Sequence, residues 1–327
     1  MSYSNQDTRS WGEKMLIGGA DEFDPDLAAL SAVQGLWLFS LILMAIWSAV
    51  ISGRKHGSTQ PIANLYMFWI ALSIAILHYT FSFTKAMITQ FGAWIRASYL
   101  VVDLIFNSSF GILGGICLLV PIYYLIFRLH RQIGNSYDND KRTLLWAHYG
   151  FCGILAIFYL VMFGIQMRGL YESIFHPDTY GGLAEYKGIL DLGIILVAYD
   201  ALYLCAALEI LTASLWLLKQ CIQMHTRKTP GLLLLCLISM PLLTRATFEL
   251  AVSISTFIVL EDNVTFGVII ALYVFDGLCW MLAFIGIVLI SKQDSSSPTP
   301  TPFDTEKSMQ ATTAGGLIAD KSGSSSS

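Results

Sequence analysis

Residues Leu30–Ile51 read LSAVQGLWLFSLILMAIWSAVI and include no charged side chain. A helix that crosses a bilayer needs about 20 consecutive, mostly apolar residues. Six further stretches of the chain are of similar length or longer and also mostly apolar. With the first, the ranges are Leu30–Ile51, Ile62–Phe83, Ser98–Phe127, Leu145–Ile165, Gly188–Leu218, Gly231–Leu260 and Val264–Ser291. The pattern predicts an all-α, polytopic membrane protein with a bundle of seven transmembrane helices.

The composition agrees with this class. Hydrophobic residues make up 55% of the chain and charged residues 13%, whereas a typical soluble domain is about 25% charged. The net charge of -4 is small and mixed in sign, which argues against a nucleic-acid partner. No Cys/His spacing typical of a metal site occurs, so we predict no cofactor, no metal ligand and no assigned catalytic residue.

Three segments are expected along the chain. Residues 1–29 form an acidic, polar N-terminal tail, 30–292 the transmembrane domain, and 293–327 a disordered tail rich in Ser, Thr and Pro. Asp24 and Pro25 resemble a helix N-cap followed by proline at the first helical position. The first helix is therefore expected to begin near Pro25, just before the membrane.

Basic residues predict the orientation, because lysine and arginine favour short cytoplasmic loops. The odd-numbered loops have nine basic residues and the even-numbered loops four. This bias places the N-terminus outside or in a lumen and the C-terminus in the cytosol, in a plasma membrane or an endomembrane. The nine are Arg54, Lys55, Arg128, Arg131, Lys141, Arg142, Lys219, Arg227 and Lys228, and the four are Lys85, Arg96, Arg168 and Lys187.

Charged residues inside the predicted spans are the candidates for function. Such groups are costly in a bilayer, and they usually face the interior of a bundle, where they pair or serve a site. Their estimated depths fall mostly in the central and outer parts of the spans, where His78 and Asn107 could join them. The ligand- or proton-site candidates are Asp103, Asp200, Glu209, Arg245, Glu249 and Asp276.

Arg245 needs an anion at this depth. Glu249 is the first candidate, because residues four apart share a helix face. Asp276 is the second candidate and Glu209 the third. The surplus acids would be protonated, hydrated or available to a cation. Two interpretations stay open: a polar cavity that binds a ligand or protons, and a buried network that only fixes helix packing.

Two further features predict packing. Gly111 and Gly115 have the spacing that allows another helix to approach closely. Pro241 is expected to kink the sixth span below Arg245, which could open a cavity or a hinge.

The stretches Leu243-Thr244-Arg245-Ala246-Thr247-Phe248-Glu249 and Tyr273-Val274-Phe275-Asp276 resemble the last two spans of the fungal lipid-translocating exporter family. That family consists of seven-span proteins linked to resistance to toxic lipids and drugs. Its sixth span has an arginine-aromatic-arginine-acid pattern, and its seventh an aromatic-rich start that ends in aspartate. This chain keeps one arginine, one aromatic residue and one acid at a compressed spacing, and lacks the second arginine.

Three functions remain after these observations. The preferred one is a non-enzymatic protein that binds, translocates or senses a lipid-like or amphipathic small molecule, with membrane lipids as its surroundings. The first alternative is a membrane enzyme similar to terpene cyclases, which would use buried acids as proton donors and nearby aromatic rings to stabilise a cation. The second is a receptor-like signalling protein whose C-terminal tail is the regulated output.

Overall fold

The computed structural model describes residues 14–17, 24–53, 66–91, 93–96, 99, 102–133, 139–175, 183–224, 228–257 and 266–294. In this part of the chain, seven helices are long and apolar enough to cross a membrane, as the sequence predicts. Contacts divide the chain into a compact unit Met1–Val288 and a second unit, Leu289–Ser327. The packing and the site described below belong to the first unit.

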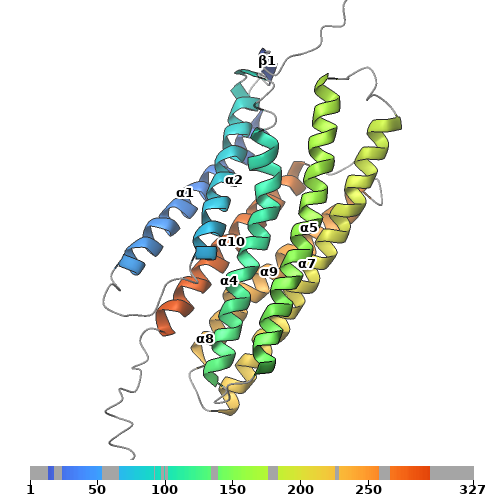
Figure 1. Ribbon diagram of the computed structural model, residues 1–327. Helices are drawn as coiled ribbons and strands as arrows, with labels where there is room; N and C mark the ends of the chain where they lie inside the picture. Colours follow the sequence, from blue (N-terminus) through green and yellow to red (C-terminus); the bar gives the residue numbers. More distant parts are fainter. Residues whose placement is uncertain are drawn as a thin grey trace, which may run out of the picture. The chain divides into compact units, whose positions relative to one another are not determined.

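The helices generally extend beyond the predicted apolar cores (Figure 1). Polar residues continue them past the predicted boundaries at several ends. The long helices are α1 (Pro25–Gly53), α2 (Tyr66–Phe91), α4 (Phe110–Ile133), α5 (Asn139–Phe175), α7 (Leu183–Gln223), α9 (Met240–Phe257) and α10 (Phe266–Asp294).

The start of α1 follows from its capping residues. Asp24 Oδ1 accepts hydrogen bonds from the backbone N–H groups of Asp26, at 2.9 Å, and Leu27, at 3.3 Å. These bonds satisfy N–H groups that have no partner within the helix. The predicted N-cap at Asp24 and the helix start at Pro25 are therefore confirmed.

Two short strands were not predicted. β1 (Lys14–Ile17) pairs antiparallel with β2 (Ala93–Arg96), with Met15 opposite Ile95. Part of the predicted N-terminal tail thus belongs to a two-stranded sheet. The rest of residues 1–23 and the tail beyond Asp294 lie outside the described residues.

The sixth apolar stretch is divided into three elements. These are α8 (Thr229–Leu233), the π-helical turn η3 (Leu234–Ser239) and α9. Pro241 lacks a backbone N–H, so the i→i−4 ladder is interrupted at its position. The sequence predicts a kink at Pro241, and what the structure has near this position is the wider π turn that ends at Ser239.

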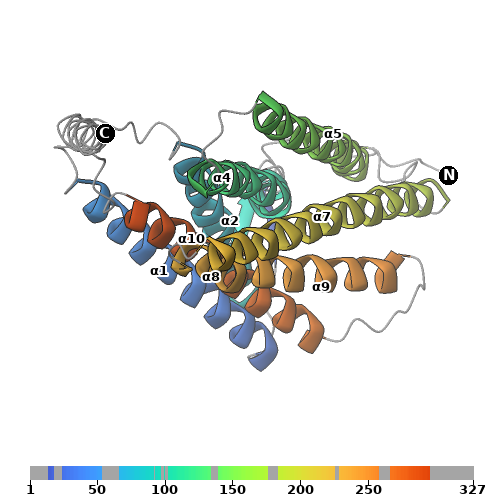
Figure 2. The same ribbon diagram turned by 90° about the horizontal axis from the view of Figure 1, so that it is seen from below.

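A second π-helical turn, η2 (Leu104–Ser109), precedes α4. Helix α7 packs against α9, α4 and α5, and α2 packs against α1 and α4. Helices α1 and α5 lie at opposite edges of this unit (Figure 2). Both have large apolar side chains on their outer faces: Phe39 is 59% exposed and Ile157 61%.

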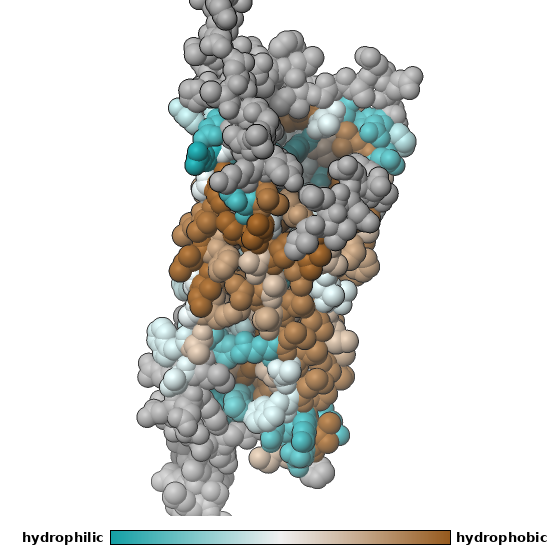
Figure 3. All heavy atoms as spheres, turned by 90° about the vertical axis from the view of Figure 1, so that its right-hand side faces the viewer, coloured by the Kyte–Doolittle hydropathy of each residue, from teal (hydrophilic) through white to brown (hydrophobic). Residues whose placement is uncertain are grey.

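Apolar residues cover the middle of the face seen in Figure 3, and polar residues lie nearer its ends. Inside the helices, hydroxyl groups bond to backbone carbonyls four residues earlier. Thr80 Oγ1 donates to Ile76 O at 2.7 Å, and Thr84 Oγ1 to Thr80 O at 2.8 Å. Such bonds allow polar side chains within long apolar helices.

Candidate functional site

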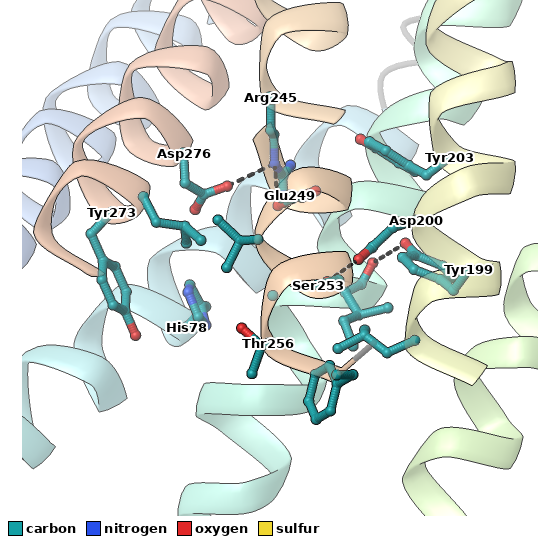
Figure 4. A pocket seen from close by; sticks show the side chains of 16 residues that line it. His78, Tyr199, Asp200, Tyr203, Arg245, Glu249, Ser253, Thr256, Tyr273 and Asp276 are labelled. Carbon is teal, nitrogen blue, oxygen red and sulfur yellow. Dashed lines mark hydrogen bonds and ion pairs between the residues drawn. The ribbon is translucent and has the colours of Figure 1, made fainter. Parts of the chain in front are cut away.

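A cavity of about 310 Å³ lies among α2, α4, α7, α9 and α10 (Figure 4). Four of the six predicted site residues line it: Asp200, Arg245, Glu249 and Asp276. His78 lines it as well. Apolar and aromatic side chains make up most of the rest of the wall, together with Ser253 and Thr256.

Arg245 on α9 is the centre of the charged cluster. Its Nε lies 2.9 Å from Glu249 Oε1 and 2.8 Å from Asp276 Oδ1. Only 7% of Arg245 is exposed. Glu249 is one helix turn away, whereas Asp276 comes from α10. The first two predicted partners of Arg245 are therefore present together, and their two carboxylates compensate the guanidinium charge.

Two aromatic rings enclose the guanidinium. Arg245 Cζ lies 5.2 Å from the centroid of the Trp280 ring and 5.8 Å from that of Tyr203. Cation–π attraction at these distances stabilises a charge that water does not solvate. The rings come from α10 and α7, so three helices hold one side chain.

Asp276 accepts two hydrogen bonds and forms an ion pair. Its Oδ1 accepts from Trp280 Nε1 at 3.0 Å and lies 2.8 Å from Arg245 Nε, while Oδ2 accepts from Tyr79 at 2.8 Å. Tyr79 lies on α2 and is buried. All three partners are donors, which matches the hydrogen-bonding capacity of a carboxylate, a group that can only accept. Asp276 thus links α2, α9 and α10.

Asp200 forms a second polar contact in the wall. Ser253 Oγ donates to Asp200 Oδ2 at 2.5 Å, which connects α9 to α7. Both side chains are buried. The described residues contain no salt bridge to Asp200. Of the three acids that line the cavity, Asp200 is therefore the one that does not pair with Arg245.

His78 enters the wall from α2. Its Nδ1 lies 2.6 Å from the carbonyl oxygen of Asn107, in η2. Because a carbonyl oxygen can only accept, Nδ1 carries a proton in this contact. Asn107 was predicted to join the cavity, but its side chain instead accepts from Ser82 Oγ at 2.5 Å.

Glu209 lies apart from the cavity. Its Oε1 is 2.7 Å from His148 Nε2 on α5, and its Oε2 accepts from Tyr123 on α4 at 3.1 Å. The prediction that Glu209 could pair with Arg245 is wrong. Glu209 is on the part of α7 that meets α4 and α5, and its side chain is 46% exposed.

Asp103 also has another partner. Lys85 Nζ donates to Asp103 Oδ2 at 2.9 Å. Lys85 was assigned to the second loop, but it belongs to α2, where Asp103 compensates its charge. Helices likewise contain Arg168 and Lys187, so three of the four basic residues counted for the even-numbered loops lie within helices, as do five of the nine counted for the odd-numbered loops.

The glycines of α4 accommodate rings. A Cβ at Gly111 would lie 3.2 Å from His78 Cε1, at Gly115 3.4 Å from the Tyr203 hydroxyl oxygen, and at Gly114 2.6 Å from Trp280 Cη2. Helices α2 and α7 do pack against α4, and the atoms nearest to a Cβ at Gly111 or Gly115 belong to side chains of these two helices. Because glycine has no side chain, the rings of His78, Tyr203 and Trp280 can lie directly against the backbone of α4.

Sequence reasoning missed Tyr79 and Ser253. Ser253 lies one turn beyond Glu249, so the polar stripe of α9 could have been continued to it. Tyr79 gave no such signal, since tyrosines in apolar helices are common at membrane interfaces as well as in cores.

No group of three or more His, Cys, Asp or Glu side chains in the described ranges could hold a metal ion. Comparisons with protein-family models, curated proteins and solved structures return no match for this chain. The functional argument therefore depends on the cavity and its residues.

Proposed function

We propose that the chain is an integral, multi-pass membrane protein that binds, translocates or senses an amphipathic small molecule through the cavity beside Arg245. Seven long apolar helices support the membrane location, as do the exposed apolar faces of α1 and α5. The N-terminus is outside or in a lumen and the C-terminus in the cytosol, as the basic residues indicate.

The cavity is the observation that carries the proposal. Its volume falls at the lower end of small-molecule sites, which span roughly 300–1,000 Å³. Its wall combines apolar side chains such as Leu196, Val252 and Leu272 with a few converging polar groups. A ligand with one polar end and an apolar remainder matches both parts of this wall.

The resemblance to lipid-translocating exporters adds support of a limited kind. Arg245, Glu249 and Asp276, which carry it, form one ion-paired cluster at the cavity. The enzymatic alternative gains less. Of the acids that such an enzyme could use, Asp276 accepts hydrogen bonds from Tyr79 and Trp280 and pairs with Arg245. Glu209 lies outside the cavity.

A cavity-filling substitution tests the proposal. Val252 lines the cavity, so Val252→Trp should abolish binding and flux of lipophilic fluorescent probes in reconstituted vesicles. Ile157→Trp is the matched control, because it adds the same ring to the exposed face of α5. The control should behave like the wild type.

Two results would count against the function. If the wild type neither binds nor moves any probe of positive, negative or zero charge, the cavity has no such role. If Val252→Trp and Ile157→Trp bind equally well, binding occurs elsewhere on the protein.

A further inference from the structure

Two residues that line the cavity each have a buried polar atom with no hydrogen-bond partner among the described residues. The atoms are Arg245 Nη1 and the hydroxyl oxygen of Tyr203. Arg245 is 7% exposed and Tyr203 1%. Buried polar groups are nearly always hydrogen-bonded, and leaving one unpaired is costly. Two such atoms on residues of one cavity therefore indicate a ligand atom that would pair with both.

The two groups face one another across the wall. Tyr203 projects from α7 with its hydroxyl end toward Arg245 on α9 (Figure 4). Arg245 Cζ lies 5.8 Å from the centroid of the Tyr203 ring. An oxygen atom with two lone pairs, placed between the two groups, could accept a hydrogen bond from each of them.

The charges of the wall restrict the kind of ligand. Three carboxylates and one guanidinium line the cavity, and Arg245 already pairs with Glu249 and Asp276. An anionic head would therefore meet an excess of negative charge. An ammonium head can only donate, and Arg245 Nη1 can only donate, so an ammonium leaves Nη1 unpaired.

We infer that the cavity takes the head of an uncharged amphiphile, whose hydroxyl or carbonyl oxygen accepts hydrogen bonds from Arg245 Nη1 and the Tyr203 hydroxyl. The apolar part of this molecule lies against Leu196, Val252 and Leu272. This inference depends on the proposed function and names the ligand class for the same cavity.

The experiment compares four photoactivatable probes on the full-length protein in lipid vesicles. Each probe has a hexadecyl chain with a diazirine, and the ends are an alcohol, an amine, a carboxylate and a methyl group. Crosslinks are mapped to α7 and α9 by mass spectrometry. The alcohol probe should label these helices most strongly, and excess unlabelled hexadecanol should compete with it.

Tyr203→Phe is the decisive variant, because it removes an oxygen that has no partner among the described residues. Its thermal stability without ligand should equal or exceed that of the wild type. Alcohol labelling should fall about fivefold, which is the loss of binding expected when one hydrogen bond is removed. Tyr123→Phe is the matched control. It removes a hydroxyl that donates to Glu209 outside the cavity, so alcohol labelling should be unchanged.

Three results would overturn the inference. One is alcohol labelling of Tyr203→Phe at the wild-type level, and another is stronger labelling of α7 and α9 by the amine or the carboxylate. In both cases a ligand still binds and the proposed function stands. The third is the absence of labelling by all four probes, which removes the proposed function together with the inference.

Discussion

Arg245 Nε and Asp276 Oδ1 lie 2.8 Å apart, and this ion pair joins α9 to α10 among mostly apolar side chains. Through Asp276 the contact extends to Tyr79 on α2, and through Glu249 it extends along α9. One arginine thus fixes the relative rotation of several helices and forms part of the cavity wall. Its substitutions should affect both packing and binding.

Arg245→Ala should be more destabilising than any loop substitution. It leaves Glu249 and Asp276 without their shared cation in a low-dielectric setting, and breaking a buried ion pair costs about 3–5 kcal/mol in soluble proteins. Thermal unfolding of the purified protein in detergent measures the effect. A melting temperature within a degree or so of the wild type would show that Arg245 contributes little to packing.

Apolar replacement of the same cluster separates packing from binding. Arg245→Met with Glu249→Leu should restore only part of the lost stability, since Asp276 keeps Tyr79 and Trp280 but loses its cation. Adding Asp276→Leu should restore more, because buried ion pairs can often be replaced by apolar residues. If the triple variant binds probes as the wild type does, all three residues serve packing alone.

Asp276→Asn should destabilise the protein more than Glu249→Gln. Asp276 accepts hydrogen bonds from Tyr79 on α2 and Trp280 on its own helix α10, and it pairs with Arg245 on α9. Glu249 pairs only with Arg245, on its own helix. An amide presents one acceptor oxygen, so an asparagine side chain at this position cannot replace all three contacts. Chemical and thermal unfolding of both variants in the same detergent rank the two effects. The reverse ranking would contradict the assigned role of Asp276.

The sequence predicts the helices well and the polar contacts only in part. Long apolar runs specify spanning segments, and the i,i+4 rule finds the Arg245–Glu249 pair because both residues lie on one helix. Which acid reaches Arg245 from another helix depends on helix rotation, which a sequence pattern does not define. Glu209 therefore could not be assigned to His148 on α5 in advance. Strand β1, with four residues, is too short for a periodic signal.

Glu209→Gln should leave probe binding unchanged. Glu209 contacts His148 and Tyr123 and does not line the cavity. A modest loss of stability is expected, because a charge-assisted bond between α5 and α7 becomes a neutral one. Parallel binding and melting measurements distinguish the two effects. Loss of binding at full stability would place Glu209 in the functional site after all.

The orientation has a direct test. A reporter fused after Lys292 should be cytosolic, and one placed before Met15 should be outside or in a lumen, because basic residues concentrate on the odd-numbered loops. Protease accessibility in sealed vesicles reads out each end. Protection of an N-terminal tag in right-side-out plasma-membrane vesicles, or its digestion in sealed endomembrane vesicles whose cytosolic face points outward, would reverse the orientation.

Gly114→Ala should destabilise the protein, whereas Gly153→Ala should not. A Cβ at Gly114 would lie 2.6 Å from Trp280 Cη2, so the indole must move, and with it the bond from Trp280 Nε1 to Asp276. Overpacking of this kind costs about 1–3 kcal/mol. A Cβ at Gly153 on α5 would meet no neighbouring atom of the described residues within 4 Å, and alanine favours a helix by up to about 1 kcal/mol over glycine.

Thermal unfolding of the two glycine variants, with a third that combines Gly114→Ala and Trp280→Phe, isolates the cause. The smaller ring of phenylalanine relieves the clash but lacks the N–H that Asp276 accepts. The double variant should therefore be less destabilised than the sum of its single substitutions, since the two residues are in contact. If the two losses of stability simply add, Gly114→Ala does not destabilise the protein by displacing Trp280. The ring would then not be what requires a glycine on α4.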